Sequence, residues 1–205
     1  MKKLFFLLSF NFLLASLGIA QIIVSNAAYK ANFSNTYHVP KYVSYYLYKG
    51  GGPCDRKPFH FKNDRQDLLT ASDDDYSHSG YEKGHLANAE DFAFDCIKDE
   101  MTFRYYNCLP QTANLNKGPW KSNETLVREW SQKEKLYIIC GGVFGSATMG
   151  NGIAIPSFCW KVVQSAKTKK ILYCGWFSNT NHATEEEITV TELEKRLKTK
   201  IVVLK

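Results

Sequence analysis

The chain has 205 residues, with 26 lysines and arginines against 20 aspartates and glutamates, which gives a formal charge of +6. This mild basicity is compatible with a polyanionic partner but does not require one, because lysine-rich stretches are usually solvated faces. The six cysteines lie at least twelve positions apart, which argues against the short paired spacings of zinc-ribbon and thioredoxin-type sites. No repeat, low-complexity tract or second membrane segment is visible in the sequence.

The amino-terminal segment has the three-part layout of a secretory signal. Two lysines precede an apolar stretch from Leu4 to Leu17, and small residues end the segment at Ala20. We expect residues 1–20 to be a signal peptide and residues 21–205 to form a single domain, secreted or periplasmic and without stable membrane association after cleavage. An uncleaved anchor is the alternative, because apolar residues resume at Ile22 and a membrane span needs roughly 20 of them.

Beyond this segment, the apolar pattern predicts a sheet with helices packed on it. The aromatic-rich residues 42–48 are typical of a strand, and residues 54–80 form a mostly irregular stretch. A capping box at residues 191–194 predicts a short helix near the carboxyl terminus. Further strands are predicted over residues 103–106, 136–140, 158–163 and 171–177. The favoured fold class is α+β, with a central antiparallel or mixed sheet flanked by helices.

A longer helix is predicted near the middle of the chain. Pro119 suits a first helical turn, and good helix formers run from Lys121 to Lys135. The helix should therefore begin at or just after Asn116. Asn116 and Glu124 would then lie about two turns apart on the same side, where the carboxylate can support a site at the asparagine.

Three strings carry the candidate chemistry. They are Tyr81–Leu86, Tyr106–Gln111 and Leu115–Trp120. Cutting a phosphodiester needs a base near neutral pKa to deprotonate water, and a hard cation to hold the phosphate and the departing oxygen. His85 can be the base, and the preceding Gly84 would let the backbone turn sharply and present the imidazole. Asn116 offers an amide oxygen, which suffices for Mg²⁺ because this ion keeps several waters and binds substrate phosphates.

Together these strings resemble the DNA/RNA non-specific endonucleases with a ββα-metal site. That family carries Asp-Arg-Gly-His-Leu where this chain has Glu82 to Leu86, and its Leu-Asn-x-Gly-x-Trp helix start matches Leu115 to Trp120. The family's strand end is similar to residues 103–111, and its carboxyl-terminal strand and helix are similar to residues 155–162 and 190–196. The resemblance thus covers nearly the whole chain beyond the signal.

The resemblance implies a site and an activity. His85 would be the general base, and Asn116 the one direct protein ligand of Mg²⁺, with Mn²⁺ as the alternative ion. The residues implied to support the site are Glu82, Asn107, Gln111 and Glu124, and those implied to bind phosphate are Lys83 and Arg56. The implied activity is that of a sugar-non-specific endonuclease acting on DNA and RNA, with the oligomeric state left open.

Three positions qualify this assignment. Glu82 and Lys83 stand where the family has aspartate and arginine, and lysine lacks the planar fork that grips a phosphate through two hydrogen bonds. For Glu124, an ordinary i,i+4 ion pair with Arg128 is the alternative to a role in the site. The sequence therefore leaves open how firmly the substrate is gripped.

Three other interpretations use different features. Asp73–Asp75 with His78 would be a metal cluster, yet consecutive acids are more often a solvated turn. Ser77 or Ser79 with His78 would suggest a hydrolase triad, but no strand-to-helix nucleophile elbow surrounds them. A catalytically silent nucleic-acid-binding module is the third, and it needs neither a histidine base nor an amide ligand merely to contact phosphate.

The cysteines suggest cross-linking in an exported chain, although six of them allow many pairings. We expect at least one disulfide that involves Cys54, Cys96 or Cys108, which lie nearer loops. The other three sit in apolar strand-like segments, where a buried free thiol is an equally good explanation: Cys140, Cys159 and Cys174.

Overall fold

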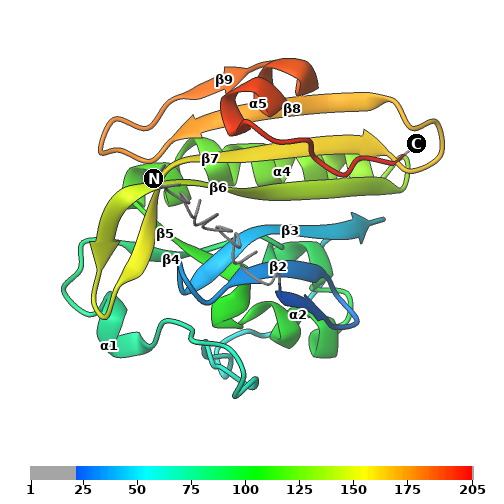
Figure 1. The fold of residues 1–205 in the computed structure, drawn as a ribbon. Helices are drawn as coiled ribbons and strands as arrows, with labels where there is room; N and C mark the ends of the chain where they lie inside the picture. The colour runs from blue at the N-terminus through cyan, green and yellow to red at the C-terminus, as the bar shows by residue number, and fades with distance from the viewer. Residues whose placement is uncertain (1–21, 205) are drawn as a thin grey trace, which may run out of the picture.

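The computed structural model describes residues 22–204, so the expected signal peptide lies outside the described residues. A seven-stranded sheet forms the centre, in the order β1-β2-β3-β6-β7-β8-β9 with every neighbouring pair antiparallel (Figure 1). Its strands are β1 (Ile22–Ser25), β2 (Lys30–Ser34), β3 (Val39–Leu47), β6 (Leu136–Met149), β7 (Ile153–Ser165), β8 (Ile171–Ser178) and β9 (Glu185–Glu187). The predicted α+β class is confirmed.

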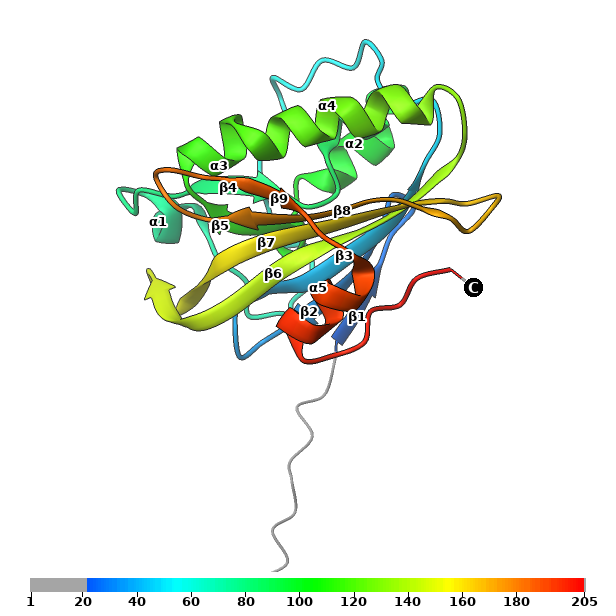
Figure 2. The same ribbon diagram turned by 90° about the horizontal axis from the view of Figure 1, so that it is seen from above.

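Helices cover both faces of this sheet. They are α1 (Asp73–Tyr76), α2 (Cys96–Thr102), α3 (Ala113–Lys117), α4 (Pro119–Ser131) and α5 (Val190–Leu197), with 3₁₀ turns η1 (Ala89–Phe92) and η2 (Tyr105–Asn107). Figure 2 shows α2, α3 and α4 above the sheet and α5 below it. Of the helices in residues 22–204, none has both the length and the apolar character needed to span a membrane.

Two apolar cores follow from this layering. The larger core lies on the α4 face and includes Trp120 and Val127 of the helix. The smaller core lies on the α5 face, where Trp160 and Leu193 pack together. Strand β7 is buried over most of its length because helices cover it on both sides. This double coverage explains why its sequence is nearly continuously apolar rather than alternating.

Four of the predicted strands coincide wholly or largely with observed strands, and two of the observed strands, β6 and β7, are much longer than predicted. Residues 42–48 overlap β3, and residues 136–140, 158–163 and 171–177 fall within β6, β7 and β8. Strands β6 and β7 extend into a long hairpin whose turn places Gly150 at φ 47° and Gly152 at φ 87°. Glycine tolerates these positive φ values, so the sequence Gly-Asn-Gly marks the turn.

The remaining elements are inserted between two neighbouring strands. Strands β3 and β6 pair directly, with Val43 opposite Cys140. The chain between them forms a second, two-stranded sheet of β4 (Glu82–His85) and β5 (Cys108–Gln111), followed by α3 and α4. Two antiparallel strands followed by a helix make a ββα arrangement, and it packs on one face of the large sheet (Figure 2).

The strand predicted over residues 103–106 is wrong. This stretch enters the 3₁₀ turn η2, and strand β5 begins later, at Cys108. The Tyr105 hydroxyl donates to Asp73 at 2.7 Å and the Tyr106 hydroxyl donates to Asp64 at 2.9 Å. These tertiary hydrogen bonds outweigh the β-propensity of the aromatic side chains, which is only a weak preference.

The predicted helix boundaries also need correction. Asn116 belongs to α3, whereas Glu124 belongs to α4, so the two do not share one helix. Gly118 separates the helices, and a Cβ there would lie 2.3 Å from the Asn114 carbonyl oxygen. Helix α4 does start at Pro119, but it ends before residue 135, where the chain turns into β6. Helix α5 is capped by Thr189 rather than by a box at residues 191–194.

One expected disulfide is present, between Cys54 and Cys96. It ties the irregular segment after β3 to the start of α2. Within residues 22–204 the other cysteines are free and buried: Cys108, Cys140, Cys159 and Cys174.

Replacing both Cys54 and Cys96 with alanine should lower the free energy of unfolding by roughly 2–4 kcal/mol, because the unfolded chain regains the freedom of a loop spanning 42 positions. Chemical denaturation of the oxidised wild type and the double variant measures this loss. Reductant should destabilise the wild type and leave the double variant unchanged. Equal stability of the oxidised wild type and the variant would contradict the expectation.

Candidate active site

The ββα arrangement presents His85 at the end of β4, and Gly84 is needed there for close packing. A Cβ on Gly84 would lie 2.1 Å from Oε1 of Gln111, a fully buried residue of β5 that pairs with Glu82. Gly84 lies in regular strand and pairs with Leu109, so the sharp turn expected at this glycine is wrong. The glycine makes room for the Gln111 side chain, whose Nε2 reaches Cys159 Sγ at 3.5 Å.

The His85 imidazole is enclosed by aromatic rings. Its centroid lies 4.7 Å from the Phe61 ring and 4.9 Å from the Phe103 ring, which meets it edge-on at 81°. Its Nε2 is buried and has no hydrogen-bond partner among residues 22–204. Burial, with a smaller contribution from the Arg56 charge, lowers the pKa of His85 to about 3. The imidazole is therefore neutral at physiological pH and able to accept a proton.

The backbone around His85 is held from two sides. Asn107 is fully buried; its side chain accepts the Ala87 N–H at 2.9 Å and donates to the carbonyls of Ala87 and Thr102. From α4, the Trp120 indole N–H donates to the His85 carbonyl at 3.2 Å. The strand end that carries the imidazole is thus fixed by two buried side chains.

Asn116 meets Glu82 on the other side of β4. The Asn116 amide donates to Oε2 of Glu82 at 2.9 Å, and the Lys117 ammonium forms an ion pair with the same carboxylate. Partial burial raises the pKa of Glu82, but Lys117 and Asn116 outweigh it, so the pKa lies below its usual value. Glu82 is therefore ionised and orients the asparagine amide.

This arrangement fits a hard cation. Because the Asn116 N–H₂ group is engaged by Glu82, its Oδ1 is the atom left to act as a ligand, and no residue within 22–204 donates to it. One amide oxygen suits Mg²⁺, which keeps several waters. The described residues contain no group of three or more His, Cys, Asp or Glu that could hold a metal ion. A cation here would rest on Asn116, on water and on substrate oxygens.

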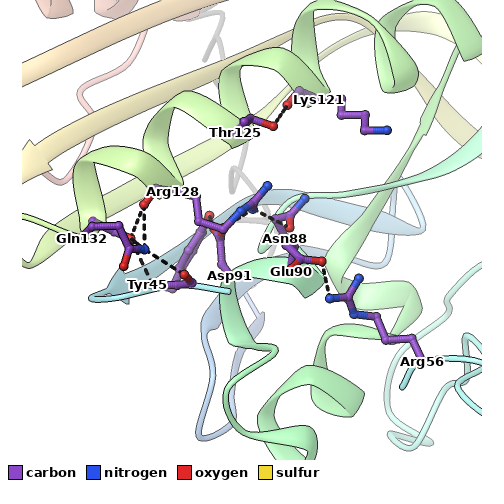
Figure 3. A network of polar contacts seen from close by, with 11 residues as sticks. Tyr45, Arg56, Asn88, Glu90, Asp91, Lys121, Thr125, Arg128 and Gln132 are labelled. Atoms are coloured by element: carbon purple, nitrogen blue, oxygen red, sulfur yellow. Dashed lines mark hydrogen bonds and ion pairs between the residues drawn. The ribbon is translucent and has the colours of Figure 1, made fainter. Parts of the chain in front are cut away.

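Glu124 is buried at 7% exposure on α4 and does not form the surface pair considered for it. Arg128 instead turns to η1, where it donates to Asp91 at 2.7 Å and to Asn88 at 3.3 Å (Figure 3). The Tyr45 hydroxyl donates to the other Asp91 oxygen at 2.9 Å. Glu124 thus lies within a buried charge network that the sequence motifs did not indicate.

The two cationic residues expected at phosphate are both held by carboxylates. The Lys83 ammonium pairs with Asp73 and lies 5.5 Å from the centre of the Phe61 ring. Arg56 donates to Asp99 at 2.8 Å and forms an ion pair with Glu90, as Figure 3 shows for the latter. A phosphate that binds to either cation would compete with these carboxylates.

The aspartate run has structural partners. Asp75 is buried and accepts hydrogen bonds from the Ser72 N–H at 2.8 Å and from the Asn151 N–H at 2.8 Å, so it links α1 to the β6–β7 turn. Asp73 pairs with Lys83 and accepts the Tyr105 hydroxyl. The solvated-turn interpretation is therefore wrong for Asp75, which is a helix cap and a tertiary contact.

The structure brings the candidates together in three clusters. The first cluster is His85, Lys83 and Phe61, because alternation along β4 places His85 and Lys83 on the same face, where both side chains contact Phe61. Glu82 points to the opposite face of the strand. The second cluster is Glu82, Asn116 and Lys117, and the third is Glu124 with Asn88, Asp91, Arg128 and Lys161. Trp120 joins the first cluster to the third through its hydrogen bond to His85.

Comparison with known proteins assigns the class. The model of the DNA/RNA non-specific endonuclease family matches residues 15–203, so the chain belongs to this family. It is 28% identical to human mitochondrial nuclease EXOG over 192 aligned residues, and this alignment covers 80% of the present chain and 52% of EXOG. A nuclease of Nostoc sp. is 36% identical over 91 residues, which is 43% of this chain and 33% of that protein.

Further comparisons agree. Human mitochondrial endonuclease G is 27% identical over 128 residues, covering 55% of this chain and 43% of that protein. A solved structure of the EndoG/EndoGI complex matches with a TM-score of 0.75 and 21% identity over 86% of this chain and 83% of that chain, which shows a shared fold. The chain spans about half the length of the EXOG proteins it matches, at 52% for the human protein.

The low pKa of His85 should make stability depend on pH in metal-free protein. Between about 3 and the ordinary value of 6.5, the unfolded chain binds a proton at this position that the folded chain does not. The free energy of unfolding should therefore fall as pH drops below 6.5, by up to about 1.4 kcal/mol per pH unit, relative to His85→Gln.

Denaturation of both proteins in EDTA between pH 7 and pH 5 tests this, because the other titrating groups cancel in the difference. Parallel stability curves for wild type and His85→Gln would show that the histidine titrates normally.

Proposed function

We propose that the chain is a Mg²⁺-dependent, sugar-non-specific endonuclease that hydrolyses phosphodiester bonds of DNA and RNA, with Mn²⁺ as an alternative ion. The observation that carries this proposal is the neutral, partly exposed His85 imidazole in β4, the strand whose Glu82 also holds the amide of Asn116. Membership of the DNA/RNA non-specific endonuclease family supports it independently.

In the proposed reaction, the His85 imidazole, which is only partly buried, takes the proton of a water that attacks the phosphorus. The aromatic enclosure and the nearby Arg56 charge disfavour the resulting imidazolium, so the proton is readily passed on. The buried hydrogen bonds of Asn107 and Trp120 keep the imidazole in place as the proton moves.

Asn116 supplies the protein oxygen for the cation, and Glu82 holds the amide by accepting its N–H, which leaves that oxygen free to bind. A bound Mg²⁺ would neutralise charge on the phosphate and on the departing oxygen. Lys83 and Arg56 would add positive charge beside the phosphate once it displaces their carboxylate partners. We further propose that the protein acts outside the cytoplasm after removal of residues 1–20, which rests on the sequence alone.

His85→Ala should lower turnover on plasmid DNA and on RNA by about 10²–10⁴-fold while leaving DNA binding largely intact, because only the proton acceptor is removed. Asn116→Ala should lose rate that high Mg²⁺ partly restores, and EDTA should abolish wild-type cleavage. Gel assays with Mg²⁺ or EDTA measure all three outcomes.

His78→Asn is the matched control, because asparagine accepts the φ of 55° at that exposed position. It should cleave at the wild-type rate; loss of cleavage there would favour the metal-cluster or hydrolase interpretation around residues 73–79. Wild-type protein that binds DNA without cutting it would leave the silent binding module as the function.

A further inference from the structure

A lysine is buried under the proposed site. Lys161 lies in the middle of β7 with only 1% of its surface exposed, between the apolar neighbours Trp160 and Val162. Its ammonium lies 4.1 Å from the centre of the Trp120 ring on α4. Lysine is almost never fully buried unless its charge is compensated, so this position requires a specific explanation.

The compensating charges belong to the cluster around Glu124. Asp91 and Glu124 contribute two carboxylates, and Arg128 and Lys161 contribute two cations, so the buried cluster is balanced. Arg128 is already engaged by Asp91 at 2.7 Å. Among residues 22–204, Lys161 forms no ion pair within 4 Å, so its charge acts on Glu124 and Asp91 through the buried cluster rather than by direct contact.

The other titratable groups of this region are neutral. Burial raises the pKa of the Cys140 and Cys159 thiols to about 12, and it raises the pKa of the Tyr45 phenol well above its usual value. Burial also raises the pKa of Glu124, against which Lys161, Asn88 and Arg128 act, while Asp91 adds to the rise. Among these neighbours, Lys161 opposes the rise most strongly.

We infer that Lys161 is a positioning residue of the proposed nuclease site: its buried ammonium balances the charge of Glu124 and seats Trp120, whose indole holds the His85 backbone. The inference rests on the proposed function for its catalytic consequence. Its structural consequence, a charge balance between Lys161 and Glu124, stands apart from catalysis. Removing the ammonium alone leaves Glu124 uncompensated beneath α4, so the carboxylate takes up a proton near neutral pH rather than remain charged.

The experiment uses Lys161→Met, which keeps an unbranched chain over Trp120 without the charge, alongside Glu124→Gln and the double variant. Lys161→Met should melt at a lower temperature than wild type, and the added Glu124→Gln should recover part of that loss because the cluster is balanced again. Val163→Ala, two positions along the same buried strand, is the control for lost packing and should show no recovery with Glu124→Gln.

Activity gives a second readout. Lys161→Met should lower kcat by at least about tenfold near neutral pH, as expected for loss of a group that orients the site, and Lys161→Arg should retain more rate than Lys161→Met. The loss should shrink as pH is raised toward 9, because Glu124 regains its charge, whereas the rate of Val163→Ala should keep the wild-type pH profile. In the Glu124→Gln background, Lys161→Met should add little further loss.

The outcomes separate the two proposals. Wild-type protein without Mg²⁺-dependent cleavage overturns the proposed function, while the melting temperatures still test the charge balance. Strictly additive melting effects, or a Lys161→Met protein with the wild-type rate and pH profile, overturn the role of Lys161 while the nuclease function stands.

Discussion

The seating of Trp120 between the sheet and the strand β4 is the contact on which the rest of the site depends. This indole is fully buried, packs edge-on against Phe177 of β8 at 5.2 Å and lies over the Lys161 ammonium. Its N–H reaches the His85 carbonyl, so one side chain connects the large sheet, α4 and the two-stranded sheet. A buried indole needs a hydrogen-bond acceptor, and the strand that carries the imidazole provides it.

The site combines two electrostatic environments within one ββα arrangement. Around His85, two neighbouring aromatic rings bury part of the imidazole and keep it neutral. Beneath α4, buried charges of opposite sign compensate one another, as the ion pair of Arg128 with Asp91 illustrates. The apolar surroundings favour the unprotonated form of the base. The charges of opposite sign hold α4 in place and together add no net charge to the site. The two environments meet at Trp120.

The sequence predicted the parts of the fold that depend on local pattern. The strands around residues 42–48 and 158–163 follow from apolar runs, and the start of α4 follows from Pro119, which fits only the first turn of a helix. The strand expected at Tyr105 failed because its hydroxyl is used in a tertiary hydrogen bond to Asp73. Local preference carries no information about such distant partners.

For the candidate site, too, the sequence indicated the residues that belong to local motifs and missed the contacts between distant segments. The motifs gave His85 and Asn116 as candidates, but not the break at Gly118 that places Asn116 and Glu124 on separate helices. The sequence contains one sign of the role of Lys161, which is a lysine inside an apolar strand pattern. It contains no sign of the role of Asp91, because the partners of this residue come from the distant elements β3 and α4. Spacing along the chain cannot show which charges are buried together.

The insertion of the ββα arrangement between β3 and β6 has a consequence for how the chain folds. These strands are neighbours in the sheet, yet about ninety residues separate the end of one from the start of the other. The chain must close this long loop before the pairing contributes any stability, and the entropic cost grows with loop length. Proteins dominated by such non-local pairing collect their native contacts slowly. The segment that carries the candidate site is thus synthesised before the strand that closes the sheet beside it, and the completed sheet is a late event in folding.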